Sequence, residues 1–176
     1  MAGVFLRALC MDDLRFTHKW HSDRDLYDTL VGPFRYVSLE AEEEWLRGKV
    51  AFSNQEVNLM ICLHENAKPI GLVSVRDIDW FARKGHLAGI FIGEAEYQNQ
   101  GHGTEALNLM IKHCFQDLGL NRIYTNILAD NLASQAMFKK CGFSVEGQLR
   151  QHAFKEGKLR DVVLVGICSD QYCKKN

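Results

Sequence analysis

The chain has 176 residues, of which 47% are hydrophobic and 24% are charged. This is the length and balance of one globular domain that can bury a core of its own. Its 21 Lys and Arg nearly cancel its 22 Asp and Glu, which leaves a net charge of -1. The balance argues against a nucleic-acid binder that relies on neutralising phosphates. Two prolines and the lack of a polar tract argue against a disordered region.

No segment has the pattern of a targeting signal or a membrane span. Arg7 interrupts the apolar N-terminal stretch, and the apolar run over 162–168 is too short to cross a bilayer. We therefore expect a cytoplasmic protein without a membrane partner. The six cysteines form no C-x-x-C pair, which favours reduced, buried thiols. Neither they nor the seven histidines recur at metal-ligand spacing, so no metal is expected.

The N-terminal third predicts a strand and two helices. A short strand over 4–9 is followed by a helix that starts at Asp12 and ends near Ser22. The segment over 23–37 is ambiguous apart from a Gly-Pro turn, and Ser38 is a suitable N-cap for the next helix. A solvated face is the favoured interpretation of that helix's acidic residues, and a cation site is the alternative. These residues are Glu40, Glu42, Glu43 and Glu44.

The rest of the chain alternates between segments with the two-residue hydrophobic period of strands and segments with the 3.6-residue period of helices. Period-two patterns and their turns predict strands over 57–63, 70–77, 86–93, 121–128 and 159–168. An apolar stripe from Leu107 to Leu118, ended by Gly119, predicts a helix, and another covers 131–141. With a further extended segment after Gly142, the order predicts one α+β domain over 1–176. Its mixed sheet would have about seven strands and about four flanking helices.

One segment has the pattern of a ligand-binding turn. Gln98-x-x-Gly101-x-Gly103-Thr104 lies between a predicted strand and an amphipathic helix. The glycines permit close backbone approach, and the helix start leaves N–H groups unpaired at the positive end of its dipole. Such a turn can bind a diphosphate without a basic side chain; an ordinary helix start is the alternative. The turn lacks the ending of a nucleotide P-loop and the third glycine of a dinucleotide site.

With two later motifs, this segment resembles the GNAT superfamily of N-acetyltransferases. Residues 98–103 match the [Gln/Arg]-x-x-Gly-x-[Gly/Ala] acyl-CoA signature of that family. Residues 131–134 and 138–143 resemble its Asn-x-x-[Ser/Ala] helix, which ends in Lys-x-Gly-Phe. A third motif, over 145–150 with Gly157 and Asp161, is similar to the branch of ribosomal-protein N-terminal, spermidine and amino-sugar acetyltransferases. The resemblance spans nearly the whole chain.

The resemblance implies a GNAT fold in which the strands over 86–93 and 121–128 splay into a V. The pantetheine arm of acetyl-CoA would enter this gap and bind the backbone at Phe91 and Ile92. An N–H group there would also be the oxyanion donor. The His102 side chain is expected to point outward while its amide faces the ligand. The further residues expected at the cofactor are Gln98, Asn99, Gln100, Gly101, Gly103, Thr104, Asn131, Ser134, Phe138 and Lys140.

The implied activity is acetyl transfer from acetyl-CoA to a primary amine by direct attack in a ternary complex, with no metal. The acceptor would be a protein N-terminus, a polyamine, an amino sugar or an aminoglycoside. His86 and Glu94 are the candidate bases, and a structural role is the alternative for each. Phe138 stands where many family members have a Tyr that protonates the leaving thiolate. Packing is its better interpretation, and we expect activity to survive without that hydroxyl.

Three further questions stay open at the level of sequence. A second hypothesis is an acyl-CoA-binding sensor or assembly module without turnover, and the missing hydroxyl at Phe138 leaves this hypothesis open. The segment over 24–37 is expected to shape the acceptor pocket, and the acidic helix after Ser38 favours a cationic acceptor if it lines the cleft. The final strand and the tail over 170–176 are where a second copy would pair in a homodimer.

Overall fold

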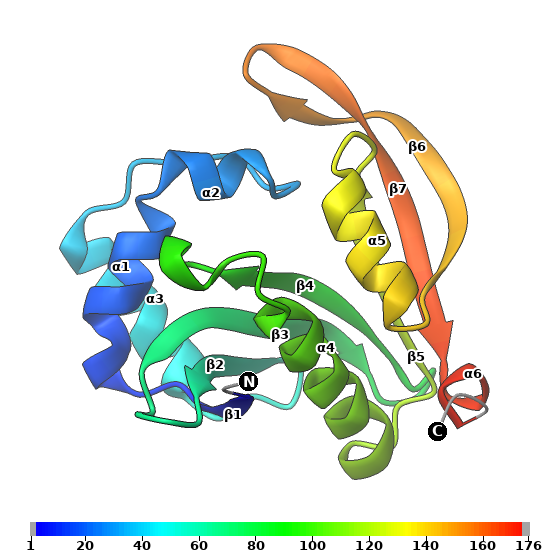
Figure 1. Cartoon of the computed structure of the whole chain (residues 1–176), viewed down its shortest axis with the longest axis horizontal. Helices are drawn as coiled ribbons and strands as arrows, with labels where there is room; N and C mark the ends of the chain where they lie inside the picture. Colours follow the sequence, from blue (N-terminus) through cyan, green and yellow to red (C-terminus); the bar gives the residue numbers. More distant parts are fainter. Residues whose placement is uncertain (1–2, 174–176) are drawn as a thin grey trace.

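A mixed seven-stranded sheet runs through the residues that the computed structural model describes, 3–173 (Figure 1). The strand order is β1-β2-β3-β4-β5-β7-β6, and every neighbouring pair is antiparallel except β4 and β5. The strands are β1 (Val4–Ala8), β2 (Val57–Leu63), β3 (Pro69–Asp79), β4 (Lys84–Ile92), β5 (Arg122–Leu128), β6 (Ser144–Lys155) and β7 (Lys158–Cys168). The expected α+β domain with a seven-stranded mixed sheet is confirmed.

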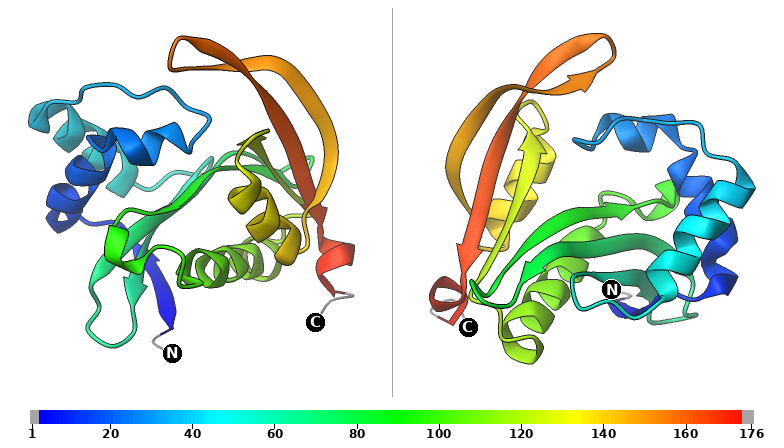
Figure 2. Two further views of the ribbon diagram at one scale, coloured as in Figure 1. Left: turned by 45° about the horizontal axis from the view of Figure 1, so that its top comes forward. Right: turned by 180° about the vertical axis from the view of Figure 1, so that it is seen from behind.

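Helices cover both faces of this sheet (Figures 1 and 2). They are α1 (Leu14–His21), α2 (Arg24–Asp28), α3 (Leu39–Val50), α4 (His102–Lys112), α5 (Leu132–Lys140) and α6 (Ser169–Cys173). Along β2, Ile61 and Leu63 join the core under α4, while Met60 and Cys62 join the core under α1 and α3. This is the alternation expected of a strand with both faces buried. No helix of the described residues is both long and apolar enough to span a membrane.

The helix after the glycine-rich turn forms as its apolar stripe predicts. Leu107, Met110, Ile111 and Cys114 are all fully buried against the sheet. After α4 the chain makes one π-helical turn over His113–Asp117. This helical segment ends at Gly119, whose φ of 65° is the left-handed conformation expected of a helix terminus. Cys62, Cys114 and Cys141 are buried free thiols, and burial raises the pKa of Cys114 to about 12.

Two helices were not expected from the sequence. α2 has five residues and lies within the segment left ambiguous. Its N-cap is Asp23, whose side chain accepts a hydrogen bond from the Leu26 N–H. One helical turn is too short to show a 3.6-residue period. α6 covers part of the C-terminal tail, and residues 174–176 of that tail lie outside the described residues. The described part of the chain therefore has six helices where about four were expected.

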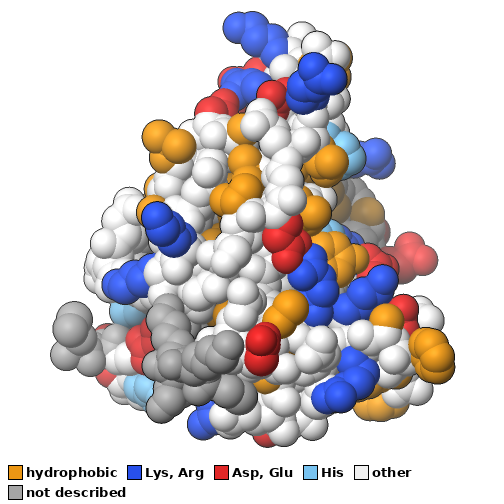
Figure 3. Space-filling view, turned by 90° about the vertical axis from the view of Figure 1, so that its right-hand side faces the viewer, with side chains coloured by type: hydrophobic (Ala, Val, Ile, Leu, Met, Phe, Trp, Pro, Cys, Tyr) orange, Lys and Arg blue, Asp and Glu red, His pale blue; other side chains and the backbone are white. Residues whose placement is uncertain are grey.

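β6 is an outer strand of the sheet, and it pairs only with β7 among the described strands. Val145 and Phe154 on β6 and Leu159 on β7 are exposed apolar side chains. On this side of the molecule, hydrophobic side chains are interspersed with Lys and Arg and do not gather in one continuous patch (Figure 3). Charges placed along an outer strand oppose uncontrolled edge-to-edge pairing.

The predicted splay of the two central strands is present. β4 and β5 pair only over three positions, from Lys84 with Arg122 to His86 with Tyr124. Just beyond, Val75 pairs with Leu87 and Ser74 with Gly89, so Ala88 is an extra residue in β4. Such a bulge bends its strand. The two strands diverge from this point, which opens a V-shaped gap at their far ends (Figure 2).

Gly93, directly after β4, is a position at which the packing of the sheet face under α1 can be tested by substitution. A Cβ atom on Gly93 would lie 2.4 Å from the ring of Trp20, which is fully buried. We expect Gly93→Ala to lower the free energy of unfolding by about 1–3 kcal/mol, because neither group can move into open space. Denaturant unfolding measures this. Gly89→Ala, where the new methyl meets nothing within 4 Å, is the control; equal stability of the two variants would contradict the packing argument.

Candidate cofactor and active site

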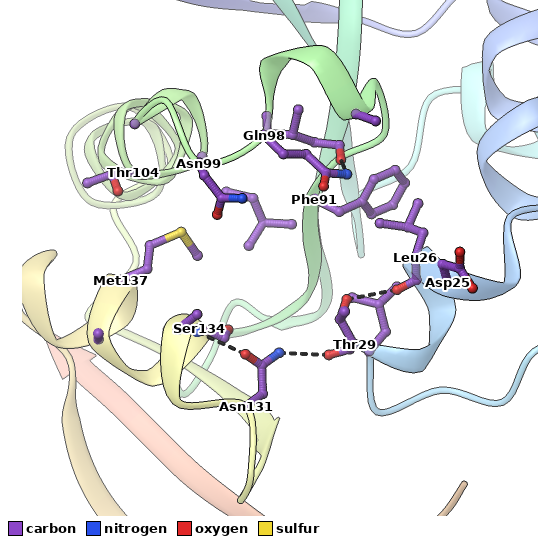
Figure 4. A pocket seen from close by; sticks show the side chains of 18 of the residues that line it. Asp25, Leu26, Thr29, Phe91, Gln98, Asn99, Thr104, Asn131, Ser134 and Met137 are labelled. Atoms are coloured by element: carbon purple, nitrogen blue, oxygen red, sulfur yellow. Dashed lines mark hydrogen bonds between the residues drawn. The ribbon is translucent and has the colours of Figure 1, made fainter. Parts of the chain in front are cut away.

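A cavity of about 750 Å³ lies between β4, the start of α4 and α5, and α2 closes one side of it (Figure 4). It is formed where the diverging strands cannot pair. Many residues predicted at the cofactor line it, namely Phe91, Ile92, Gln98, Asn99, Gly101, Gly103, Thr104, Asn131, Ser134 and Lys140. The residues from the segment around α2 are Asp23, Asp25, Leu26, Thr29 and Leu30. Part of the segment expected to shape the acceptor pocket thus borders the same cavity as the glycine-rich turn.

The glycine-rich turn ends in an exposed helix start. Gly101 is the N-cap of α4 with a φ of 90°, and no side chain caps the helix there. Its carbonyl accepts the first helical hydrogen bond, from Glu105. The amides of the first turn therefore keep their hydrogen-bonding capacity beside the cavity, at the positive end of the helix dipole. This arrangement fits a negatively charged diphosphate.

The backbone of β4 presents Ile92 to the gap and Phe91 to β3. The Phe91 carbonyl oxygen points at Gly71 of β3, 2.1 Å from where a Cβ would stand, and the Gly93 N–H bonds the Ile70 carbonyl at 2.8 Å. Because backbone groups alternate along a strand, the N–H and C=O of Ile92 point the other way. The Ile92 carbonyl accepts a hydrogen bond from Gln98 Nε2 at 2.9 Å.

Three residues predicted at the cofactor lie outside the lining of this cavity. Gln100 donates from its amide to the Glu96 carbonyl. His102 was expected to point outward, and this is wrong: it is 8% exposed, with its ring 6.1 Å from that of Tyr97. The turn before α4 folds back over the helix start and covers the imidazole. Phe138 is 3% exposed and packs edge-to-face on Phe143, the packing position that the sequence favoured.

Glu94 is held in an ion pair at the end of β4, in which the carboxylate is largely buried and the Lys19 side chain is exposed. Its carboxylate accepts hydrogen bonds from Lys19 Nζ at 2.8 and 2.9 Å and from Trp20 Nε1 at 2.9 Å. Burial acts to raise the pKa of Glu94, but these hydrogen bonds outweigh it and hold the pKa below its ordinary value. A carboxylate stabilised in its charged form is a weak proton acceptor. The contacts thus favour the structural interpretation of Glu94.

His86 lies where the pairing of β4 and β5 ends. Its ring stacks on Tyr124, with 5.2 Å between centroids, and its Nδ1 is 3.8 Å from Asp77. Burial lowers the pKa of His86, and the charge of Arg76 lowers it further. The imidazole is therefore neutral at pH 7 and able to accept a proton. Neither candidate base, His86 or Glu94, is among the residues that line the cavity.

The acidic helix does not line the cavity. Glu42 is buried, and its carboxylate lies 2.9 Å from His21 Nδ1, while Glu43 pairs with Arg47 along the helix surface. The sequence favoured a cationic acceptor only if this helix lined the cleft, and the helix does not line the cavity. The acidic residues among those that line it are Asp23, whose side chain caps α2, and Asp25, which is exposed. Sequence reasoning left their segment ambiguous, and only Asp23, as a capping residue, carried a local signal.

The comparisons with known proteins agree with this geometry. Residues 4–144 match the family model described as an acetyltransferase (GNAT) domain. The chain is 28% identical to a spermidine N(1)-acetyltransferase of Vibrio cholerae over 97% of this chain and 96% of that protein. It is 29% identical to the Escherichia coli K12 enzyme of the same name, over 97% and 88%.

Solved structures show the same similarity. A crystal structure of spermidine N-acetyltransferase from Vibrio cholerae in complex with CoA and spermine superposes with a TM-score of 0.89. It is 27% identical to this chain and covers 97% of this chain and 98% of that one. A dodecameric structure of the Vibrio cholerae enzyme has a TM-score of 0.84, with 27% identity and 98% of both chains covered.

The chain belongs to the GNAT acetyltransferase family. It is an acetyl-CoA-dependent N-acetyltransferase whose acceptor is a primary amine. The alternative of a binding module without turnover is not favoured.

Two glycines of the turn, Gly101 and Gly103, allow the effect of backbone conformation on cofactor binding to be measured apart from the effect of added side-chain volume. Gly101→Ala forces a residue with a Cβ into the left-handed region, at a cost of about 1–2 kcal/mol. Gly103→Ala adds the same methyl at ordinary contact distance, 3.4 Å from Met137 Sδ. We expect the Kd for acetyl-CoA to rise about tenfold in the first variant and less than about threefold in the second. Calorimetric titration measures both; equal affinities would contradict the role of Gly101.

Proposed function

We propose that this N-acetyltransferase acetylates a primary amine of an aliphatic polyamine. The observation that carries the proposal is the charge at the two ends of the cavity. Lys140 lines the end formed by α5, while Asp23 and Asp25 line the end formed by the α2 segment. An anionic cofactor and a cationic acceptor are matched by this polarity. The two spermidine acetyltransferases that align over almost the whole chain point to the same acceptor class.

The cofactor site follows from the same cavity. The amides at the start of α4 bind the pyrophosphate, and the backbone of Ile92 binds the pantetheine arm along the unpaired edge of β4. Asn99, Ser134 and Lys140 flank the arm and the phosphates. Acetyl-CoA supplies the acetyl group as a thioester. The Ile92 N–H, which faces the gap, donates to the carbonyl oxygen as negative charge develops on it.

Transfer then requires orientation and one proton acceptor. The amine nitrogen forms a bond to the acetyl carbon while the carbon–sulfur bond breaks. The proton lost by the amine leaves through a chain of water molecules toward His86, the candidate acceptor, which is not among the residues that line the cavity. The leaving thiolate takes a proton from solvent. Phe138 has no hydroxyl to contribute, and a thiol with a pKa of about 8.5 leaves without an acid. Alignment of the two reactants supplies most of the rate.

An amine panel tests the acceptor class. Thiol release from acetyl-CoA is measured with spermidine, spermine, an amino sugar, an aminoglycoside and a peptide with a free N-terminus. Spermidine and spermine are expected to give the highest kcat/KM. A higher value for any of the other three would overturn the polyamine proposal, and no release with any amine would overturn turnover itself.

Removing one cavity carboxylate sharpens this test. Asp25→Asn is expected to raise the KM for spermidine about threefold, because an exposed ion pair with the cationic acceptor is lost. The Kd for acetyl-CoA is expected to stay unchanged. Glu44→Gln removes a carboxylate from the exposed face of α3 and is the matched control, with wild-type kinetics expected. An effect of equal size in the control would show that only the overall charge matters.

The pH dependence tests His86. Its pKa is lowered, so the imidazole is mainly neutral above pH 7. Protonation of the amine, with an ordinary pKa of about 10, lowers kcat/KM over the whole range, and protonation of His86 below about pH 6.5 is expected to add a further acidic limb. His86→Gln should reduce kcat about 100-fold and remove this acidic limb. Rate measurements from pH 5 to 9 on both proteins check this. A variant that keeps the wild-type rate and limb would exclude His86 as the base.

A further inference from the structure

The segment that closes the cavity begins in the last residues of α2 and continues without regular structure. We call residues 27–32, the last two residues of α2 and the four that follow, the strap. Thr29 and Leu30, in its middle, line the cavity. Its local backbone hydrogen bonds run from Tyr27 N to Asp23 O, from Thr29 N to Leu26 O and from Leu30 N to Tyr27 O. The strap leads from the end of α2 toward α5 and the β6–β7 hairpin (Figures 1 and 4).

Lys155 ties both ends of the strap to the hairpin. It is the last residue of β6 and is 5% exposed. Its ammonium donates to the Tyr27 carbonyl at 2.6 Å and to the Gly32 carbonyl at 2.7 Å. Burial lowers the pKa of Lys155, which reflects the cost of removing this charge from water. Charged donors offset that cost when they bond carbonyl oxygens at short distance.

A second side chain holds the strap from the cofactor side. Asn131 Nδ2 donates to the Thr29 carbonyl at 2.9 Å, while its Oδ1 accepts from Ser134 N and caps α5 (Figure 4). Val31 adds an apolar contact with the cluster of Leu128, Ala153 and Val162. Three strap carbonyls are therefore bonded by side chains that lie 102 to 128 residues away in sequence. The position of this cavity wall depends on them.

We propose that Lys155 is a positioning residue for the amine acceptor, because it fixes the strap so that Thr29 and Leu30 form the acceptor side of the cavity. Asn131 links the same wall to α5, which borders the cofactor. The inference rests on the proposed function, since it takes the α2 side of the cavity as the acceptor side. Lys155 itself does not line the cavity and touches neither reactant.

The test is Lys155→Met, which keeps the length of the side chain and removes its three donors. We expect the KM for spermidine to rise about tenfold, with the Kd for acetyl-CoA changed less than about twofold. Lys158→Met is the matched control, since it removes an exposed lysine from the same hairpin. It should retain wild-type kinetics. An unchanged acceptor KM in Lys155→Met, or an equal loss of acetyl-CoA affinity, would overturn the inference.

Hydrogen exchange gives a readout that needs no turnover. The amides of Thr29 and Leu30 should exchange about tenfold faster in Lys155→Met than in the wild type, while those of α4 stay unchanged. Uniform acceleration over the whole chain would indicate a merely structural role and overturn the inference. If Lys155→Met fails to fold, Lys155→Gln replaces it, because a shorter neutral amide cannot bond both the Tyr27 and the Gly32 carbonyl. The same acceptor-specific loss is then expected.

The two proposals fail in distinguishable ways. If the wild-type protein acetylates no polyamine, the proposed acceptor class is wrong, and hydrogen exchange still reports whether Lys155 holds the strap. If the wild type acetylates spermidine and Lys155→Met does so with the same KM, the acceptor class stands and the positioning role is wrong.

Discussion

The separation of β4 from β5 is the constraint on which the rest of the molecule depends. The pairing ends at His86 and Tyr124, after which the N–H and C=O groups on one edge of β4 face a gap where a neighbouring strand would normally lie. A buried backbone group without a partner costs about 1–3 kcal/mol. The bulge at Ala88 lies where the separation begins, and Gln98 offsets part of its cost by bonding the Ile92 carbonyl. A ligand that binds like an added strand completes the edge.

The two sides of the gap are fixed by different kinds of contact. On one side, Glu94 joins the end of β4 to α1 through Lys19 and Trp20, just before the glycine-rich turn begins. On the other side, Lys155 and Asn131 join the hairpin and α5 to the strap. These polar contacts hold segments without regular structure, where apolar packing alone gives little directional control. Glu94 is thus committed to architecture, which leaves proton transfer to another group.

The sequence predicted what local periodicity and family motifs encode. The buried stripe of α4 from Leu107 to Cys114 and the glycine turn at Gly101 were both readable, because each depends on residues a few positions apart. The strap contacts were not, since Lys155 and Tyr27 are 128 residues apart and neither carries a local signal of the other. His102 was misassigned for a different reason: Tyr97 is only five residues away, but the irregular turn between them has no periodicity from which the burial of the ring could be predicted.

Phe138 shows why positioning carries so much of the chemistry in this protein. The side chain is 3% exposed and packs against Phe143, so it holds α5 in place and does not reach the cavity. No hydroxyl at this position protonates the leaving thiolate, and the thiolate departs near its own pKa. The rate must then come mainly from holding amine and thioester in line, an effect equivalent to concentrations of about 10⁵–10⁸ M. A displacement of about 1 Å in the acceptor wall would forfeit much of that gain. The buried Lys155 donates hydrogen bonds to two strap carbonyls and not to a reactant. This is consistent with an enzyme that relies on alignment of the reactants more than on acid catalysis.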